Sequence, residues 1–135
     1  MDFYCGALNI NQQSIFTAAW EPSQSEGTAL IVHGYLDNLV LFGHLIDYLL
    51  AQNLTVVCFD LPGLGLSEGE SAFINDFSDY TAVLQGVISL CKGQFTAPFH
   101  GFGQSTGGAI LLKHLLDKEP GEAYSFKSLN LLAPL

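Results

Sequence analysis

A G-x-S-x-G sequence between an apolar run and a helical pattern constrains this chain more than any other feature. The motif is Gly103-Gln104-Ser105-Thr106-Gly107, with an apolar run at 97–102 before it and helical spacing at 109–116 after it. A strand, a tight turn and a helix in this order form a nucleophile elbow, which presents a serine hydroxyl at its tip. Gly103 and Gly107 would keep the flanks of the turn bare, because glycine has no Cβ and accepts strained backbone angles. The motif predicts Ser105 as a nucleophile, and a glycine-rich turn without chemistry is the alternative.

Apolar runs and helical patterns alternate along the rest of the chain. We expect strands at 4–10, 14–20, 28–32, 54–59, 98–102 and 126–133, and helices at 39–50, 76–90 and 109–116. The first two strands should form a hairpin, and the second helix should begin at Asn75 or Asp76 and end at Lys92-Gly93. Such alternation predicts an α/β fold with a mostly parallel sheet and helices on both faces. A content of 49% hydrophobic and 13% charged residues suits a sheet buried in this way.

Three glycine-containing loops follow predicted parallel strands. They are His33-Gly34-Tyr35, the segment 60–69, and the elbow at Ser105. In open parallel sheets the ligand site lies at the carboxyl ends of the strands. The topology therefore brings these three loops to one edge of the sheet, where we expect the active site.

These motifs together resemble the α/β-hydrolase fold. The resemblance rests on four segments in the family's order, and it covers nearly the whole chain: 33–35, 59–63 (Phe-Asp-Leu-Pro-Gly), 65–69 (Gly-Leu-Ser-Glu-Gly) and 103–107. Asp-x-Pro-Gly-x-Gly-x-Ser followed by Gly-Glu is similar to the monoacylglycerol lipase and lysophospholipase branch, which includes serine aminopeptidase-like members. This sequence departs from the branch at Leu64, where a histidine is usual, and at Phe102 and Gln104 in the elbow.

The resemblance implies a serine hydrolase that forms an acyl-enzyme on Ser105. It assigns the oxyanion hole to the backbone N–H groups of Tyr35 and Thr106. The expected substrate is a small acyl ester, a lysophospholipid or a monoacylglycerol. An aminopeptidase-like serine peptidase remains open, as does a non-catalytic short form that binds an acyl ligand or a partner chain. Neither a metal nor an organic cofactor is expected.

The acid and the histidine of the catalytic triad are not evident in the sequence. In this fold they follow the serine, in the order acid and then histidine. The sequence stops at Leu135, where a cap segment would begin, so we expect residues 1–135 to be the N-terminal portion of a single α/β-hydrolase domain. The cap, through which transient lipid contact would occur, and the later strands would lie beyond it.

Four histidines precede that point, and for each of them we expect a role other than general base. His33 should shape the oxyanion loop, and His44 should be a surface or packing residue. His100 should be a hydrogen-bonded core residue of the elbow strand, and His114 should be exposed on the following helix. Asp60 should accept hydrogen bonds from loop amides rather than orient a base.

Composition excludes several partners. The net charge of −9 argues against nucleic acid and anionic membrane surfaces, since both attract basic patches. The three cysteines have no metal-ligand spacing and indicate a reducing compartment. We see neither a signal peptide nor an apolar stretch of about 20 residues, the length of a membrane span, and we expect a cytoplasmic protein.

Overall fold

An antiparallel hairpin begins the chain. Strand β1 (Asp2–Ile10) pairs along its whole length with β2 (Gln13–Glu21), so that Ile10 lies opposite Gln13. Asn11 and Gln12 form the two-residue turn with φ values of 51° and 63°. Positive φ at both positions is the geometry that matches the twist of a tight hairpin. The predicted hairpin is confirmed, and its strands are longer than the sequence pattern suggested.

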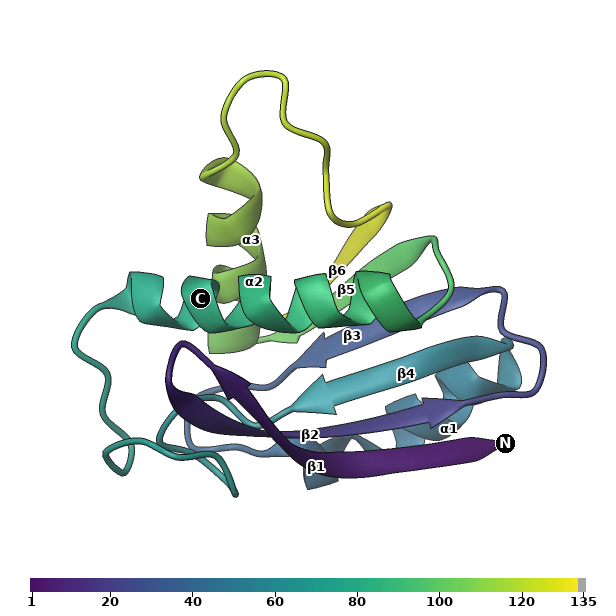
Figure 1. Cartoon of the computed structure of the whole chain (residues 1–135), viewed down its shortest axis with the longest axis horizontal. Coiled ribbons are helices and arrows are strands. Elements are labelled where there is room, and N and C mark those ends of the chain that lie inside the picture. The colour runs from purple at the N-terminus through teal and green to yellow at the C-terminus, as the bar shows by residue number, and fades with distance from the viewer. Residues whose placement is uncertain (134–135) are drawn as a thin grey trace.

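Four parallel strands continue the sheet in the computed structural model, which describes residues 1–133 (Figure 1). They are β3 (Gly27–Val32), β4 (Leu54–Phe59), β5 (Phe99–Gln104) and β6 (Ser128–Leu132). The strand order is β1-β2-β4-β3-β5-β6, and only the two pairings that involve β2 are antiparallel. Every residue of β3 is buried, as expected for a strand covered on both faces. The prediction of a mostly parallel sheet is confirmed.

Helices cover both faces of the sheet. One face carries α1 (Gly43–Ala51), and the other carries α2 (Phe77–Gln94) and α3 (Thr106–Leu116) (Figure 1). The larger apolar core lies under α2 and α3, and a smaller core lies between α1 and the sheet. Because both faces are buried, the carboxyl edge of the parallel strands and its loops are left to face outward.

The prediction of a single helix over residues 39–50 is wrong. A short 3₁₀ turn, η1 (Leu39–Phe42), precedes α1. The first two amides of η1 are occupied by side chains: Leu39 N–H donates to Asp60 Oδ1 at 2.9 Å, and Val40 N–H donates to Asn38 Oδ1 at 3.0 Å. Asn38 is thus a cap, but it caps a tight turn that is tied to another loop. The regular helix begins only after that turn.

The ends of α2 also differ in part from the prediction. Asp76 caps its start through Ser78 N–H and forms a capping box with Asp79, as the sequence indicated. The helix does not end at Lys92-Gly93 but continues to Gln94. Nothing lies within 4 Å of a Cβ built on Gly93, so the glycine sits in the helix without a packing requirement. Phe95, which packs against the larger core, ends the helix instead.

Candidate active site

Ser105 lies at a sharp turn between β5 and α3. Its backbone angles are φ 50° and ψ −115°, and residues other than glycine rarely have a positive φ. The residue is half-buried, and its side chain makes no capping hydrogen bond to the helix that it precedes. Its main chain is fixed on both sides: its N–H donates to Leu132 O at 2.9 Å, and its carbonyl accepts from Ala109 N–H at 3.2 Å. The main chain of Ser105 is therefore strained but held by hydrogen bonds on both sides. Its side-chain hydroxyl is not used to cap the helix.

The two flanking glycines occupy positions where no side chain fits. A Cβ on Gly107 would lie 2.0 Å from the carbonyl oxygen of Val32, and a Cβ on Gly103 would lie 2.7 Å from the Cα of Gly108. Both neighbours are main-chain atoms of packed elements, so neither can move aside cheaply. The missing side chains let α3 approach β3 and β5 closely enough for the turn to close. Close approach, rather than a positive φ, is what requires glycine here.

The loop after β3 lies directly against the serine. We call residues His33–Leu39 the oxyanion loop, after the role that the resemblance implies for the Tyr35 N–H. A Cβ on Gly34 would lie 3.4 Å from the Cβ of Ser105 and 3.4 Å from the carbonyl oxygen of Gln104. The structure thus brings the loop that contains Tyr35 beside the elbow, and Thr106 is the first residue of α3. Tyr35 is half exposed at this edge, whereas Thr106 is buried.

His33 fixes the base of the oxyanion loop. The side chain is 1% exposed, its Nδ1 lies 2.7 Å from Gly34 O, and its Nε2 lies 2.9 Å from the donating N–H of Leu61. Since Nε2 accepts, the ring proton is on Nδ1, which donates to the Gly34 carbonyl. Burial lowers the pKa of His33, against smaller opposing effects from that hydrogen bond and from Asp60. His33 is therefore a neutral connector between two loops, and both of its nitrogens are occupied.

Asp60 also connects the oxyanion loop with the 60–69 loop. Its carboxylate accepts from Leu39 N–H and from Leu66 N–H, each at 2.9 Å. The residue is 2% exposed, and a Cβ on Gly65 would lie 2.2 Å from its Oδ2. The expectation that Asp60 bonds loop amides is met. A buried carboxylate with two amide donors stabilises the junction of the oxyanion loop and the 60–69 loop.

The sequence did not reveal how the 60–69 loop is joined to the hairpin. The Ser67 hydroxyl donates to Asp60 O and accepts from Phe16 N–H, and the Glu68 carboxylate accepts from Ser14 N–H at 2.9 Å. The bonds to Phe16 and Ser14 connect residues more than 50 positions apart, whereas the bond to Asp60 lies within the loop. The only available signal was the presence of hydroxyl and carboxyl side chains in a glycine-rich loop, which does not specify a partner.

The remaining histidines have partners away from the serine. His100 is half-buried on β5, and its Nδ1 lies 2.7 Å from the Ser128 hydroxyl; His44 is exposed on α1. The prediction that His114 is exposed is wrong. His114 is buried, with Nε2 3.1 Å from the Ser125 hydroxyl, because the segment before β6 folds back over that face of α3. Burial lowers the pKa of both His100 and His114.

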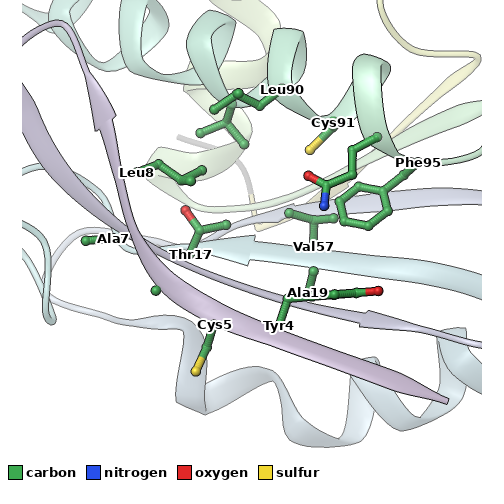
Figure 2. A pocket seen from close by; sticks show the side chains of 13 residues that line it. Tyr4, Cys5, Ala7, Leu8, Thr17, Ala19, Val57, Leu90, Cys91 and Phe95 are labelled. Atoms are coloured by element: carbon green, nitrogen blue, oxygen red, sulfur yellow. The ribbon is translucent and has the colours of Figure 1, made fainter.

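A separate apolar pocket of about 200 Å³ lies between the hairpin and α2 (Figure 2). Leu90 and Cys91 line it from α2 and Phe95 from the residue after the helix, opposite Tyr4 and other residues of the sheet. Burial raises the pKa of the Cys91 thiol to about 12, so the thiol stays protonated at neutral pH. The pocket contains none of the residues predicted for the site, and Cys91 acts there as an apolar wall.

Two further properties concern residues 1–133. No cluster of three or more histidine, cysteine, aspartate or glutamate side chains in that range could hold a metal ion. Within the same range, no helix combines the length and the apolar character that crossing a bilayer requires.

A mostly parallel sheet with a serine elbow at the carboxyl end of β5 defines the α/β-hydrolase fold. Residues 23–135 match the sequence model of the serine aminopeptidase S33 family, and the chain belongs to that family.

Similar proteins include the monoglyceride lipase of Homo sapiens, which is 31% identical over 130 residues. That match covers 95% of this chain and 42% of the lipase, so the chain spans about two fifths of the relative's length. Among solved structures, an α/β-hydrolase from a Penicillium species has a TM-score of 0.84 at 14% identity and covers 100% of this chain and 47% of its own. An esterase from Exiguobacterium antarcticum has a TM-score of 0.79 at 22% identity and covers 96% and 45%.

Proposed function

We propose that this protein is a serine hydrolase that cleaves carboxylic esters through an acyl-enzyme on Ser105. One observation carries the proposal: Ser105 occupies a strained turn at φ 50°, its side chain makes no capping bond, and Gly34 of a second loop packs against it. Lipase and esterase names among the similar proteins support the ester class.

In the proposed reaction, Ser105 Oγ attacks the acyl carbon and gives its proton to a general base. The negative charge on the tetrahedral oxygen would be received by the N–H groups of Tyr35 and Thr106. Thr106 begins α3, whose amino end carries partial positive charge. A donor of this kind typically lowers the barrier by about 3 kcal/mol. The alcohol leaves with a proton from the conjugate acid of the base, and water then hydrolyses the acyl-enzyme by the same steps.

The general base is proposed to come from outside the described residues. His33 has both nitrogens engaged, and His100 and His114 bond to Ser128 and Ser125. We propose that the triad acid and histidine follow residue 135, and that residues 1–135 are the N-terminal portion of one domain. The matches to the longer relatives support this arrangement.

The proposed substrates are monoacylglycerols or lysophospholipids, and a cap segment would provide transient contact with lipid. Similarity to monoglyceride lipases supports this choice. Three unpaired cysteines, Cys5, Cys58 and Cys91, support a cytoplasmic location. A serine peptidase that acts on a substrate amine is a second candidate, favoured by the description of the matched family and by the net charge of −9.

A labelling and turnover experiment tests the proposal. The 135-residue chain should react slowly with a fluorophosphonate probe and give no burst with a nitrophenyl acyl ester, since a triad lacking its base retains only about 10³–10⁴-fold catalysis over water. The open reading frame continued past residue 135, or a complementing C-terminal fragment, should raise turnover by orders of magnitude, and Ser105→Ala should abolish the gain.

The competing outcomes are distinct. Rapid labelling of Ser105 in the 135-residue chain would show that a base lies within it. A completed protein that is folded but inert would favour a non-catalytic form that binds an acyl ligand or a partner. Faster cleavage of aminoacyl nitroanilides than of nitrophenyl esters, relative to each substrate's rate in water, would favour the peptidase.

A further inference from the structure

The side chain of Tyr35 extends from the oxyanion loop to the turn that contains Ala72. Its hydroxyl donates a hydrogen bond of 2.9 Å to the carbonyl oxygen of Ala72, which lies 37 residues further along the chain. The residue is 50% exposed, so part of the ring remains in contact with solvent at the candidate site. The same residue thus has two functions to serve: its backbone N–H is a proposed oxyanion donor, and its hydroxyl contacts a different loop.

The acceptor of this hydrogen bond is itself firmly placed. Ala72 has φ 55° and donates its own N–H to Gly63 O at 3.0 Å. Gly63 packs so closely that a Cβ there would lie 2.3 Å from Glu70 O. The segment 63–73 is therefore a tightly bonded turn. A hydroxyl bonded to its carbonyl is attached to a fixed point rather than to a loose loop.

Helix α2 supplies a second neighbour on this side. Tyr80 is 4% exposed and belongs to the core that α2 covers. Burial raises the pKa of Tyr80, and the nearby phenol of Tyr35 raises it further. The Tyr35 hydroxyl therefore lies on the side of the oxyanion loop that faces the 63–73 turn, within electrostatic reach of Tyr80 on α2.

The backbone around Tyr35 needs such an attachment. Gly34 O accepts from His33 Nδ1 at 2.7 Å and from Asp37 N–H at 3.2 Å, and Leu36 has φ 63°. In a planar trans peptide, the carbonyl of Gly34 and the N–H of Tyr35 point in opposite directions. The partners of Gly34 O therefore set the line along which the Tyr35 N–H points, but they hold only the carbonyl end of that peptide. The other end of the peptide is joined to the Cα of Tyr35, whose side chain bonds to the Ala72 carbonyl through its hydroxyl.

We propose that Tyr35 is a positioning residue, whose hydroxyl holds its own backbone N–H in place for the oxyanion by binding the Ala72 carbonyl. This inference rests on the proposed function, because it requires an acyl transfer at Ser105. It assigns the loop-fixing role to the hydroxyl alone and leaves the half-exposed ring without a part in it. An enzyme variant that keeps the ring at position 35 but lacks its hydroxyl should bind substrate normally and stabilise the transition state poorly.

Tyr35→Phe is the decisive variant, and Tyr48→Phe is its control, because Tyr48 is 61% exposed on α1 and lies outside the site. The first measurement is amide hydrogen exchange in the 135-residue chain. Tyr35→Phe should speed exchange at residues 34–36 about tenfold or more, because the loop opens locally. Residues 106–110 of α3 and the unfolding midpoint should change little.

The second measurement is steady-state kinetics in the protein continued past residue 135, with a nitrophenyl ester. Tyr35→Phe should lower kcat by about 10- to 100-fold and leave KM within about twofold, since the loss falls on the transition state. The affinity of a trifluoromethyl ketone, a tetrahedral oxyanion analogue, should fall in proportion to kcat. Tyr48→Phe should change none of these values.

Each outcome decides the inference. Unchanged exchange at 34–36 would show that the hydroxyl does not hold the loop. Faster exchange with unchanged kcat, or a rise in KM alone, would show that it does not position the oxyanion donor. If the unsubstituted protein is folded but inert while Tyr35→Phe still speeds exchange, the proposed function has failed and the positioning role fails with it, although the tether itself stands.

Discussion

The elbow and the oxyanion loop meet at Ser105, but they are held in place in different ways. The elbow owes its shape to glycines within two residues of the serine and to the strand and helix that flank it. The oxyanion loop is held by side-chain bonds to Asp60, Leu61 and Ala72, which lie 21 to 37 residues from their partners. One half of the site is thus fixed by close packing of main chain, and the other by a small set of hydrogen bonds.

This difference predicts different weaknesses. Packing against main-chain atoms fails when a side chain is added, and it has little dependence on pH. A set of hydrogen bonds to buried side chains fails when one acceptor is lost or protonated, and it should fail locally before the whole fold does.

The largest effect is expected from Gly107→Ala in the elbow. The new Cβ would lie 2.0 Å from Val32 O, and neither β3 nor α3 can retreat without losing core contacts. We expect a loss of about 3 kcal/mol in the free energy of unfolding, measured by urea denaturation. Gly93→Ala is the control, because nothing lies within 4 Å of its Cβ and the residue is in α2. That change should stabilise by up to about 1 kcal/mol. Equal effects at the two positions would contradict the packing argument.

A smaller effect is expected from Asp60→Asn in the loop junction. The amide keeps the shape of the carboxylate but turns an NH₂ group toward the N–H of Leu39 or Leu66, so one buried amide loses its acceptor. The expected loss is about 1–3 kcal/mol in the free energy of unfolding. Amide exchange should rise at Leu39 or Leu66, whichever amide faces the new NH₂ group, and stay unchanged at Gly107.

The exposed Asp47 of α1 provides the matched control. Asp47→Asn should change stability by less than about 0.5 kcal/mol. A similar loss for the two variants, or faster exchange at the elbow than in the oxyanion loop, would mean that the two regions are not held separately.

The smallest effect is a dependence of stability on pH. Burial lowers the pKa of His33 and His114 in the folded state, so the unfolded chain takes up protons first as the pH falls. Stability contributed by the neutral rings should be complete above about pH 6.5, the unfolded value, and be lost as the pH falls toward the lowered folded values. Urea midpoints between pH 8 and pH 5 measure this loss.

Variants assign the pH dependence to particular rings. His114→Gln should make the dependence shallower, and the same change at His44, which is exposed, should leave it unaltered. Below pH 6.5, exchange at Leu61 should rise before exchange at Gly107, because protonation of His33 removes the acceptor for Leu61 N–H. A midpoint that is constant from pH 8 to pH 5 would contradict the assignment.

The sequence predicted the regular elements well where burial is uniform and poorly where side chains compete for backbone groups. The strand at 54–59 was predicted to the residue, because a short apolar run between polar ends is typical of a buried strand. The helix predicted at 39–50 became two elements because Asp60, 21 residues away, takes the amide of Leu39. His114 was misplaced because Ser125 and Phe126 return to cover it, which helical spacing alone does not reveal.

The sequence by itself determined the α/β class, the elbow and the identity of its serine. Those features depend on local rules: glycine where a turn must close, apolar residues where a strand is buried, and the alternation that makes a sheet parallel. Tertiary structure alone decided which groups hold the oxyanion loop, that His33 serves as a neutral connector with both nitrogens bonded, and that Tyr35 reaches Ala72. Hydrogen-bond partners dozens of residues apart meet only once the sheet has set the distances between loops, and no local pattern specifies such distances.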